Sequence, residues 1–241
     1  MTPLRRLARR LGYDLTPRRK GKPPHAQLVA VLAHFRISCV LDVGANAGQY
    51  GAMLREWGYP GRIVSFEPQA SAHAALARRA GTDPAWQVAP PMALGGHAGQ
   101  IELEVSAESD MSSVLPQSAL LRRVSPSSAV VRKETVPLGR LDEVAGPYLT
   151  PDDRVFLKVD TQGYETQVLA GAERLLDRLA GIQLELSLVP LYEGERDFRA
   201  MLGELAALGF EPHLFLPGYF ERKLARQLQV DGVFMRATRD L

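Results

Sequence analysis

Short apolar runs alternate along most of the chain with segments whose apolar residues recur at helical spacing. The apolar runs predict buried strands at 39–43, 62–66, 86–89, 155–159 and 182–188. The intervening segments predict helices over 49–57, 70–80, about 168–179 and about 198–208. Buried strands that alternate with helices are typical of an α/β fold, in which a parallel sheet is covered on both faces.

Two parts of the chain depart from this alternation. Residues 95–150 read as a less regular insert with strand-like runs at 101–105 and 130–136. Long inserts often carry function, so this one is a candidate lid or acceptor-binding region. Two further apolar runs, about 210–216 and 229–236, have no helical pattern between them and could pair as antiparallel neighbours.

The N-terminal region differs from the rest. Its apolar spacing predicts a short helix over 2–12, then a proline-rich linker and a second helix at about 25–36. Residues 1–22 carry eight Lys or Arg and one acid, so their net charge is 8 − 1 = +7. Such a run is usually a solvated surface helix, and the alternative is weak contact with an anionic membrane surface or nucleic acid. We divide the chain into this basic region, 1–36, and an α/β domain, 37–241.

Composition narrows the class of protein. The chain has 241 residues, of which 46% are hydrophobic and 23% charged, as is typical of soluble globular proteins. No run approaches the ~18 apolar residues of a membrane span, and no secretory signal follows the N-terminal arginines. The single cysteine, Cys39, excludes an intramolecular disulfide and a multi-cysteine metal site. We expect a cytoplasmic protein, and a homo-oligomer stays open.

The most informative segment is L-D-V-G-A-N-A-G, residues 41–48, where a strand enters a tight turn that leads into a helix. Gly44 lets the backbone leave the strand, and Gly48 removes a side chain where a ligand would approach the helix. Glu67 follows the second strand, 67 − 44 = 23 residues after Gly44. That spacing is near the ~20 residues expected for an acid that accepts hydrogen bonds from a ribose.

The same turn discriminates between nucleotide ligands. A dinucleotide-binding turn has the pattern G-x-G-x-x-G, whereas Asn46 stands where its second glycine would be. Asp42, just before the turn, would repel a pyrophosphate and suits a ligand with a cationic amino group. S-adenosylmethionine carries an ammonium, a sulfonium and a ribose, and no phosphate. The pattern therefore favours S-adenosylmethionine over NAD, and an NAD-dependent oxidoreductase is the weaker alternative.

Taken together, these motifs resemble the FkbM family of methyltransferases. The segments that carry the resemblance are LDVGANAGQYG (41–51), VSFEPQ (64–69), MALGG (92–96), LGRLDEV (138–144), FLKVDTQGYETQVLAGA (156–172), QLELSLVPLYEG (183–194) and VDGVFMR (230–236). The resemblance implies a class I methyltransferase: a Rossmann-like, seven-stranded, mostly parallel sheet with helices on both faces and the last strand antiparallel. It also implies S-adenosylmethionine as methyl donor and a hydroxyl as the usual acceptor.

The resemblance also assigns roles to residues. It implies that the methionine part of the cofactor is lined by four residues of the first strand and turn: Asp42, Gly44, Asn46 and Gly48. Glu67, followed by Pro68, would hold the ribose, and Ala93 and Leu94 would lie near the adenine. Asp160 would face the methyl group and the acceptor. The family often has an acid where this sequence has Gln162, so no catalytic role is carried over to that position.

Two carboxylates are candidates for the chemistry, because an alcohol needs a base or a metal near neutral pH. Asp160 follows an apolar strand at the ligand-binding edge of the sheet. Glu185 lies within the next apolar strand, where an unpaired carboxylate is costly. The two could share Mg²⁺, as the related macrolide sugar methyltransferases suggest by analogy. The alternative is that Glu185 pairs with Lys158 or an arginine and only stabilises the sheet.

We therefore expect an O-methyltransferase that acts on a sugar hydroxyl of a surface glycan or a glycosylated natural product. A methyltransferase acting on RNA or on another small molecule is the alternative. Outside residues 1–22 the chain carries 29 − 8 = 21 bases and 27 − 1 = 26 acids, which argues against a nucleic-acid partner. A catalytically inactive binding module is disfavoured because Asp42, Glu67 and Asp160 are all present.

Overall fold

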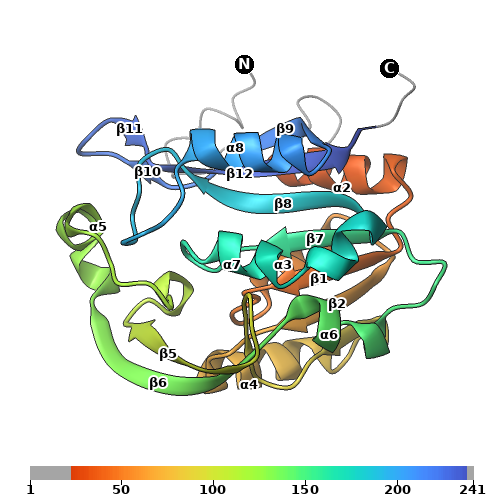
Figure 1. Ribbon diagram of the computed structural model, residues 1–241, viewed down its shortest axis with the longest axis horizontal. Helices are drawn as coiled ribbons and strands as arrows, with labels where there is room; N and C mark the ends of the chain where they lie inside the picture. The colour runs from red at the N-terminus through yellow and green to blue at the C-terminus, as the bar shows by residue number, and fades with distance from the viewer. Residues whose placement is uncertain (1–22, 238–241) are drawn as a thin grey trace, which may run out of the picture.

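The computed structural model describes residues 23–237 and builds them around a seven-stranded sheet (Figure 1). The strand order is β3-β2-β1-β7-β8-β12-β9. The strands are β1 (Cys39–Val43), β2 (Arg62–Phe66), β3 (Trp86–Val88), β7 (Val155–Val159), β8 (Leu179–Ser187), β9 (Phe210–Pro217) and β12 (Gln229–Arg236). Strand β12 pairs antiparallel with β8 and β9, whereas the other pairs are parallel. The predicted class I arrangement, with its last strand antiparallel, is confirmed.

Helices cover both faces of this sheet. One face carries α2 (Pro24–His34), α3 (Gln49–Glu56) and α4 (Ala70–Ala80), and the other carries α6 (Leu141–Val144), α7 (Glu165–Ala170) and α8 (Phe198–Ala207). Strand β1 serves both cores, because alternate side chains of a strand point to opposite faces. Leu41 joins the core under α7 and α8, while Val40 joins the core under α2 and α3.

One predicted helix is wrong in part. The apolar spacing indicated a single helix over about 168–179, but α7 ends at Ala170, a 3-10 helix covers Glu173–Arg178, and Leu179 begins β8. Gly171 lies between the two helices, and a Cβ at this glycine would overlap the carbonyl oxygen of Gly95. The backbone therefore breaks where it packs against the start of the insert, a contact that helical spacing does not reveal.

The insert is more regular than predicted. Strands β5 (Gly99–Ser106) and β6 (Val130–Gly139) pair antiparallel, and the short β4 (Ala93–Leu94) joins β6 to complete a second, three-stranded sheet. Its apolar face is buried around Leu103 and Leu138. Its other face is charged, as in the Lys133–Glu102 ion pair, and these charges interrupt the apolar pattern. The insert also contains α5 (Ala119–Val124).

The two ends of the domain complete the fold. The second N-terminal helix is confirmed as α2, whereas the predicted helix over 2–12 lies outside the described residues. Between β9 and β12, the strands β10 (Phe220–Glu221) and β11 (Arg226–Gln227) form a small hairpin. Within residues 23–237, no helix has the length and apolar character needed to cross a membrane.

Candidate active site

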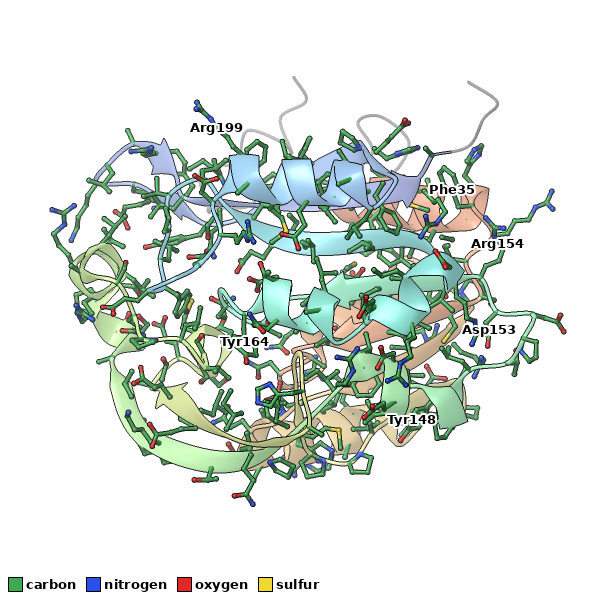
Figure 2. All side chains as sticks on the ribbon, in the orientation of Figure 1. Phe35, Tyr148, Asp153, Arg154, Tyr164 and Arg199 are labelled. Carbon is green, nitrogen blue, oxygen red and sulfur yellow. The ribbon has the colours of Figure 1, made fainter. Side chains whose placement is uncertain are left out.

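The carboxyl ends of the parallel strands form one edge of the sheet, where open α/β sheets bind ligands. Figure 2 shows the direction of β7: Asp153 and Arg154, which precede the strand, lie at the opposite end from Tyr164, which follows it. Two cavities open at the carboxyl edge. They share four lining residues, which are Gly44, Asn46, Asp110 and Asp160. The predicted turn and the predicted Asp160 therefore lie between two adjoining cavities.

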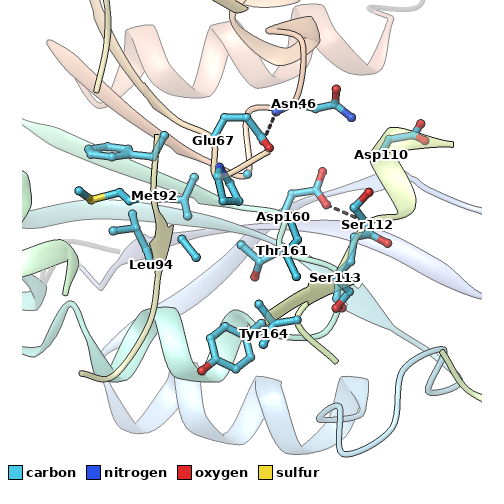
Figure 3. Close-up of a pocket in the computed structure, with 18 of the residues that line it drawn as sticks. Asn46, Glu67, Met92, Leu94, Asp110, Ser112, Ser113, Asp160, Thr161 and Tyr164 are labelled. Atoms are coloured by element: carbon cyan, nitrogen blue, oxygen red, sulfur yellow. Dashed lines mark hydrogen bonds between the residues drawn. The ribbon is translucent and has the colours of Figure 1, made fainter. Parts of the chain in front are cut away.

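The first cavity is built around Glu67 at the end of β2 (Figure 3). The backbone N–H groups of Asn46 and Gln69 donate hydrogen bonds to the two carboxylate oxygens of Glu67, each at 2.8 Å. Burial raises the pKa of Glu67 to about 7 despite these bonds. The two N–H groups fix the carboxylate at the cavity wall and leave it lone pairs to accept hydrogen bonds from hydroxyls.

Apolar side chains also line this cavity. They come from the β2 end, β4 and the insert, namely Phe66, Met92, Leu94, Leu103 and Val114. Pro68 and Ala93 also line it, so the residues predicted to lie near the ribose and adenine lie in one cavity. A carboxylate and apolar surface in the same cavity suit a ligand that joins a diol to a flat apolar ring.

The turn after β1 shapes the junction between the cavities. Gly44 has φ +72°, and a Cβ there would overlap the carbonyl oxygen of Asp160, so only glycine lets β1 and β7 approach this closely. Asn46 also has a positive φ, +45°, and its side-chain amide donates to the Ser109 hydroxyl at 3.1 Å. The turn is thereby joined to the edge of the insert.

Two predicted cofactor residues line neither cavity. Asp42 is fully buried, and its carboxylate lies 3.2 Å from the Lys158 ammonium and accepts a hydrogen bond from Ser65 at 3.0 Å. The cation that Asp42 meets in this structure is the Lys158 ammonium, and a contact between Asp42 and a cationic ligand group stays a prediction. Gly48 has φ +82°, and a Cβ there would approach a Leu76 methyl group to 2.9 Å, so backbone geometry and packing against α4 both favour glycine. Its predicted contact with the cofactor stays a prediction.

Asp160 and Glu185 do meet, through Gln162. The side-chain amide of Gln162 donates to Asp160 at 2.7 Å and to Glu185 at 2.8 Å, and its carbonyl accepts from the Tyr192 hydroxyl at 2.9 Å. Burial and the nearby charge of Asp160 raise the pKa of Glu185 well above its usual value. Glu185 lines neither of the two cavities, and its catalytic role stays a prediction. It does not pair with Lys158 either, because Lys158 contacts Asp42 and Asp160.

The second cavity, of about 650 Å³, has a size typical of ligand sites, and its lining includes a row of hydrogen-bonded polar side chains. The Tyr50 hydroxyl donates to Gln183 at 2.9 Å, and the amide of Gln183 donates to Asp231 at 3.3 Å. Burial, with the charge of Asp160, raises the pKa of Asp231 to about 6. Asp231 was not predicted from the sequence, although an acid inside the apolar run V-D-G-V-F could have indicated it.

Comparison with known proteins agrees with this geometry. Residues 42–212 match the family described as the methyltransferase FkbM domain. The chain belongs to the FkbM methyltransferase family. A search of curated proteins finds no match. The methyltransferase fold is further supported by a structure of a putative methyltransferase from Thermobifida fusca, with a TM-score of 0.52, 11% identity and coverage of 89% of this chain and 79% of that one.

Two other solved structures have lower TM-scores. An rRNA methylase from Streptococcus thermophilus has a TM-score of 0.47 at 13% identity and covers 90% of this chain and 98% of its own. A TehB-like SAM-dependent methyltransferase from Corynebacterium glutamicum has a TM-score of 0.43 at 11% identity, with coverage of 96% and 94%. Family membership makes the chain a SAM-dependent methyltransferase, and it removes the oxidoreductase and the inactive binding module.

The first cavity of this FkbM methyltransferase fits the cofactor that its family implies. Glu67 offers a fixed carboxylate for ribose hydroxyls, and Met92 and Leu94 offer apolar surface for adenine. The turn at Gly44 and Asn46 borders the path from that cavity to Asp160. With Asp42 paired to Lys158, it is the family match and this cavity, rather than the charge before the turn, that indicate S-adenosylmethionine.

The predicted Mg²⁺ does not fit. Within residues 23–237 no cluster of three or more His, Cys, Asp or Glu side chains could hold a metal ion. The space between Asp160 and Glu185 is instead filled by the N–H groups of Gln162, which donate hydrogen bonds and cannot ligate a cation. Gln162 therefore joins the two carboxylates through hydrogen bonds.

Proposed function

We propose that this FkbM methyltransferase transfers the methyl group of S-adenosylmethionine to a hydroxyl of a sugar, in a surface glycan or a glycosylated natural product. The observation that carries the proposal is the position of Asp160, which lines both cavities and whose side chain is 34% exposed. A carboxylate at that junction can accept the proton of an acceptor hydroxyl while the hydroxyl oxygen faces the first cavity.

The protein's contribution to the reaction is mainly alignment. S-adenosylmethionine, when bound, supplies a methyl group on a sulfonium that is already activated for in-line displacement. Glu67 accepts hydrogen bonds from the ribose. The turn at Gly44 lies between the first cavity and Asp160, so it helps to align the methyl group with the acceptor hydroxyl at Asp160. The side-chain amide of Gln162 donates a hydrogen bond that holds the Asp160 carboxylate in place. Alignment of this kind contributes on the order of 7–11 kcal/mol to the lowering of a barrier.

The second cavity supports a neutral, hydroxyl-rich acceptor. Asp231, Gln183 and Tyr50 offer hydrogen-bonding groups along its floor. Its one lysine, Lys158, is already matched by Asp42, so the floor has no uncompensated ammonium for a phosphate or carboxylate. This balance favours a sugar over RNA, whose backbone carries one negative charge per nucleotide.

The test is methyl transfer from labelled S-adenosylmethionine to a panel of free glycosides, with single-stranded RNA as the competing acceptor. We expect label on a glycoside, and none on a matched glycoside whose reactive hydroxyl is already methylated. Transfer to RNA, with none to any glycoside, would overturn the proposal. Calorimetry with S-adenosylhomocysteine and with NAD tests the donor separately, and only the former should bind.

A further inference from the structure

The hairpin at residues 218–228 has an exposed apolar tip. Strands β10 and β11 pair antiparallel, with Phe220 opposite Gln227. Phe220 is 50% exposed and Leu224, in the turn, is 42% exposed. Large exposed apolar side chains close together often mark a surface that contacts a partner or a membrane.

Three cationic residues belong to the same hairpin. Arg222, Lys223 and Arg226 are all exposed, and no ion pair involves them within the described chain. The one acid, Glu221, is buried and accepts hydrogen bonds from the Tyr219 hydroxyl at 2.9 Å and from the Lys223 backbone N–H at 2.7 Å. The segment has a net charge of 3 − 1 = +2, and its negative charge is turned inward.

The base of the hairpin is fixed to the domain. The backbone N–H of Leu228 donates to the carbonyl of Tyr219 at 2.8 Å, and the carbonyl of Leu228 accepts from the N–H of Leu188 at 2.8 Å. Tyr219 and Leu228 also pack in one apolar cluster with Leu121 of α5 and Tyr192. The tip is therefore presented from a well-anchored base.

The hairpin stands beside the second cavity. It leaves the sheet after Pro217 and returns at Gln229, and both Pro217 and Asp231 line that cavity. Figure 1 shows the hairpin and α5 at the same end of the molecule. A surface bound by the tip would therefore lie next to the cavity that we assign to the acceptor.

We propose that this hairpin docks the protein on an anionic lipid surface. Phe220 and Leu224 enter the headgroup layer, while Arg222, Lys223 and Arg226 meet lipid phosphates. Exposed apolar groups in one hairpin with exposed cations, which form no ion pair among the described residues, complement such a surface, because it attracts basic segments and accepts apolar side chains. As an extension that rests on the proposed function, the acceptor would be a sugar carried on a lipid and presented to the second cavity.

The experiment is co-sedimentation of the full chain with vesicles of phosphatidylcholine alone or of phosphatidylcholine with one-third phosphatidylglycerol. We expect binding to the anionic vesicles only. Phe220→Ser/Leu224→Ser should weaken that binding by about tenfold, because two apolar side chains no longer enter the lipid. Arg222→Gln/Lys223→Gln/Arg226→Gln should weaken it on the order of 100-fold at low salt.

The matched control is Val130→Ser/Val131→Ser on β6, where two exposed apolar residues precede Arg132 and Lys133. This variant should bind within about twofold of the wild type, since both hairpin side chains remain. Equal binding by the wild type and both hairpin variants would overturn the proposal. So would a change in oligomeric state without a change in vesicle binding, or loss of binding only when the arginines of residues 1–22 are replaced by Gln.

The outcomes separate this inference from the proposed function. Hairpin variants should retain methyl transfer to a water-soluble glycoside, because none of the replaced residues lines either cavity. Vesicle binding without transfer to any sugar would overturn the acceptor assignment and leave the docking surface intact. Transfer without vesicle binding would overturn the docking surface alone.

Discussion

The Lys158 ammonium lies 3.2 Å from the Asp42 carboxylate, and the two residues are in-register partners on neighbouring strands of the central sheet. Both are buried. Burial opposes the charge of Lys158, but Asp42 and Asp160 hold its pKa above the usual value. The same ammonium donates to the carbonyl of Gly44 at 3.1 Å, so one buried cation ties together the turn and the strand that carries Asp160.

Removing one partner of this pair should be costly. We expect Lys158→Met to lower the free energy of unfolding by about 3–5 kcal/mol, because Asp42 becomes an uncompensated buried charge. Chemical denaturation at neutral pH measures this loss. The double variant Asp42→Asn/Lys158→Met should recover part of it, and a single variant within about 1 kcal/mol of the wild type would contradict the ion pair.

Substitutions of Asp160 and of Asp231 should change different kinetic constants. Asp160→Asn should lower kcat by about 10²–10⁴-fold, as loss of a general base does, while S-adenosylhomocysteine binds as in the wild type. Asp231→Asn should mainly raise KM for the acceptor, because Asp231 lines the second cavity and not the first. Steady-state kinetics and calorimetry check both. Normal turnover by Asp160→Asn, with turnover lost in Asp231→Asn, would move the base to Asp231.

Cofactor affinity should depend on pH through Glu67, whose pKa burial raises to about 7. Ribose hydroxyls donate best to the ionised carboxylate, so binding favours the deprotonated form and strengthens as pH rises through 7. Between pH 8 and pH 6 we expect the Kd of S-adenosylhomocysteine to rise about tenfold. Calorimetry measures it, and Glu67→Gln should bind weakly at both pH values. A wild-type Kd that is constant over this range would exclude Glu67 as the ribose ligand.

Activity should be insensitive to EDTA, because the amide of Gln162 fills the space between Asp160 and Glu185. Gln162→Glu replaces two hydrogen bonds with a third carboxylate, so we expect a lower melting temperature that recovers as pH falls and these acids are protonated. Thermal scans at pH 5 and pH 8 measure the effect, with Gln162→Ala as the uncharged control. Loss of wild-type activity in EDTA would contradict the assignment.

At the opposite end of the sheet, Asp153 should govern acid stability. Burial opposes its charge, but hydrogen bonds from Arg62, Thr150 and Ser38 lower the pKa of Asp153 to about 2. This lowered pKa stabilises the folded state above the unfolded pKa of ~3.9, and the benefit is lost as pH falls towards 2.

Asp153→Asn should therefore cost about 2 kcal/mol of stability at pH 7 and little at pH 2. Denaturation across this pH range measures the difference between wild type and variant. Methyl transfer should be unchanged in the variant, because Asp153 lies at the amino end of β7. A stability difference that does not vary with pH would show that the lowered pKa has no such role.

The sequence by itself determined the central sheet and the class of enzyme. The strand boundaries at 62–66 and 155–159 and the antiparallel pairing of β9 with β12 follow from local apolar patterns. The family, and with it the antiparallel place of the last strand in the sheet, followed from short sequence motifs that resemble FkbM methyltransferases. The position of the site at the carboxyl edge of the sheet was also predictable, because parallel strands bring Glu67 and Asp160 to the same edge.

Only the tertiary structure decided what each polar side chain contacts. Lys158 neutralises Asp42, Gln162 takes the place proposed for a metal, and Asp231 joins the second cavity. These contacts join residues far apart in the chain, and periodicity records only whether a position faces the core. The sequence does not show whether a carboxylate contacts a lysine, an amide or a ligand, because strand register and packing select the partner.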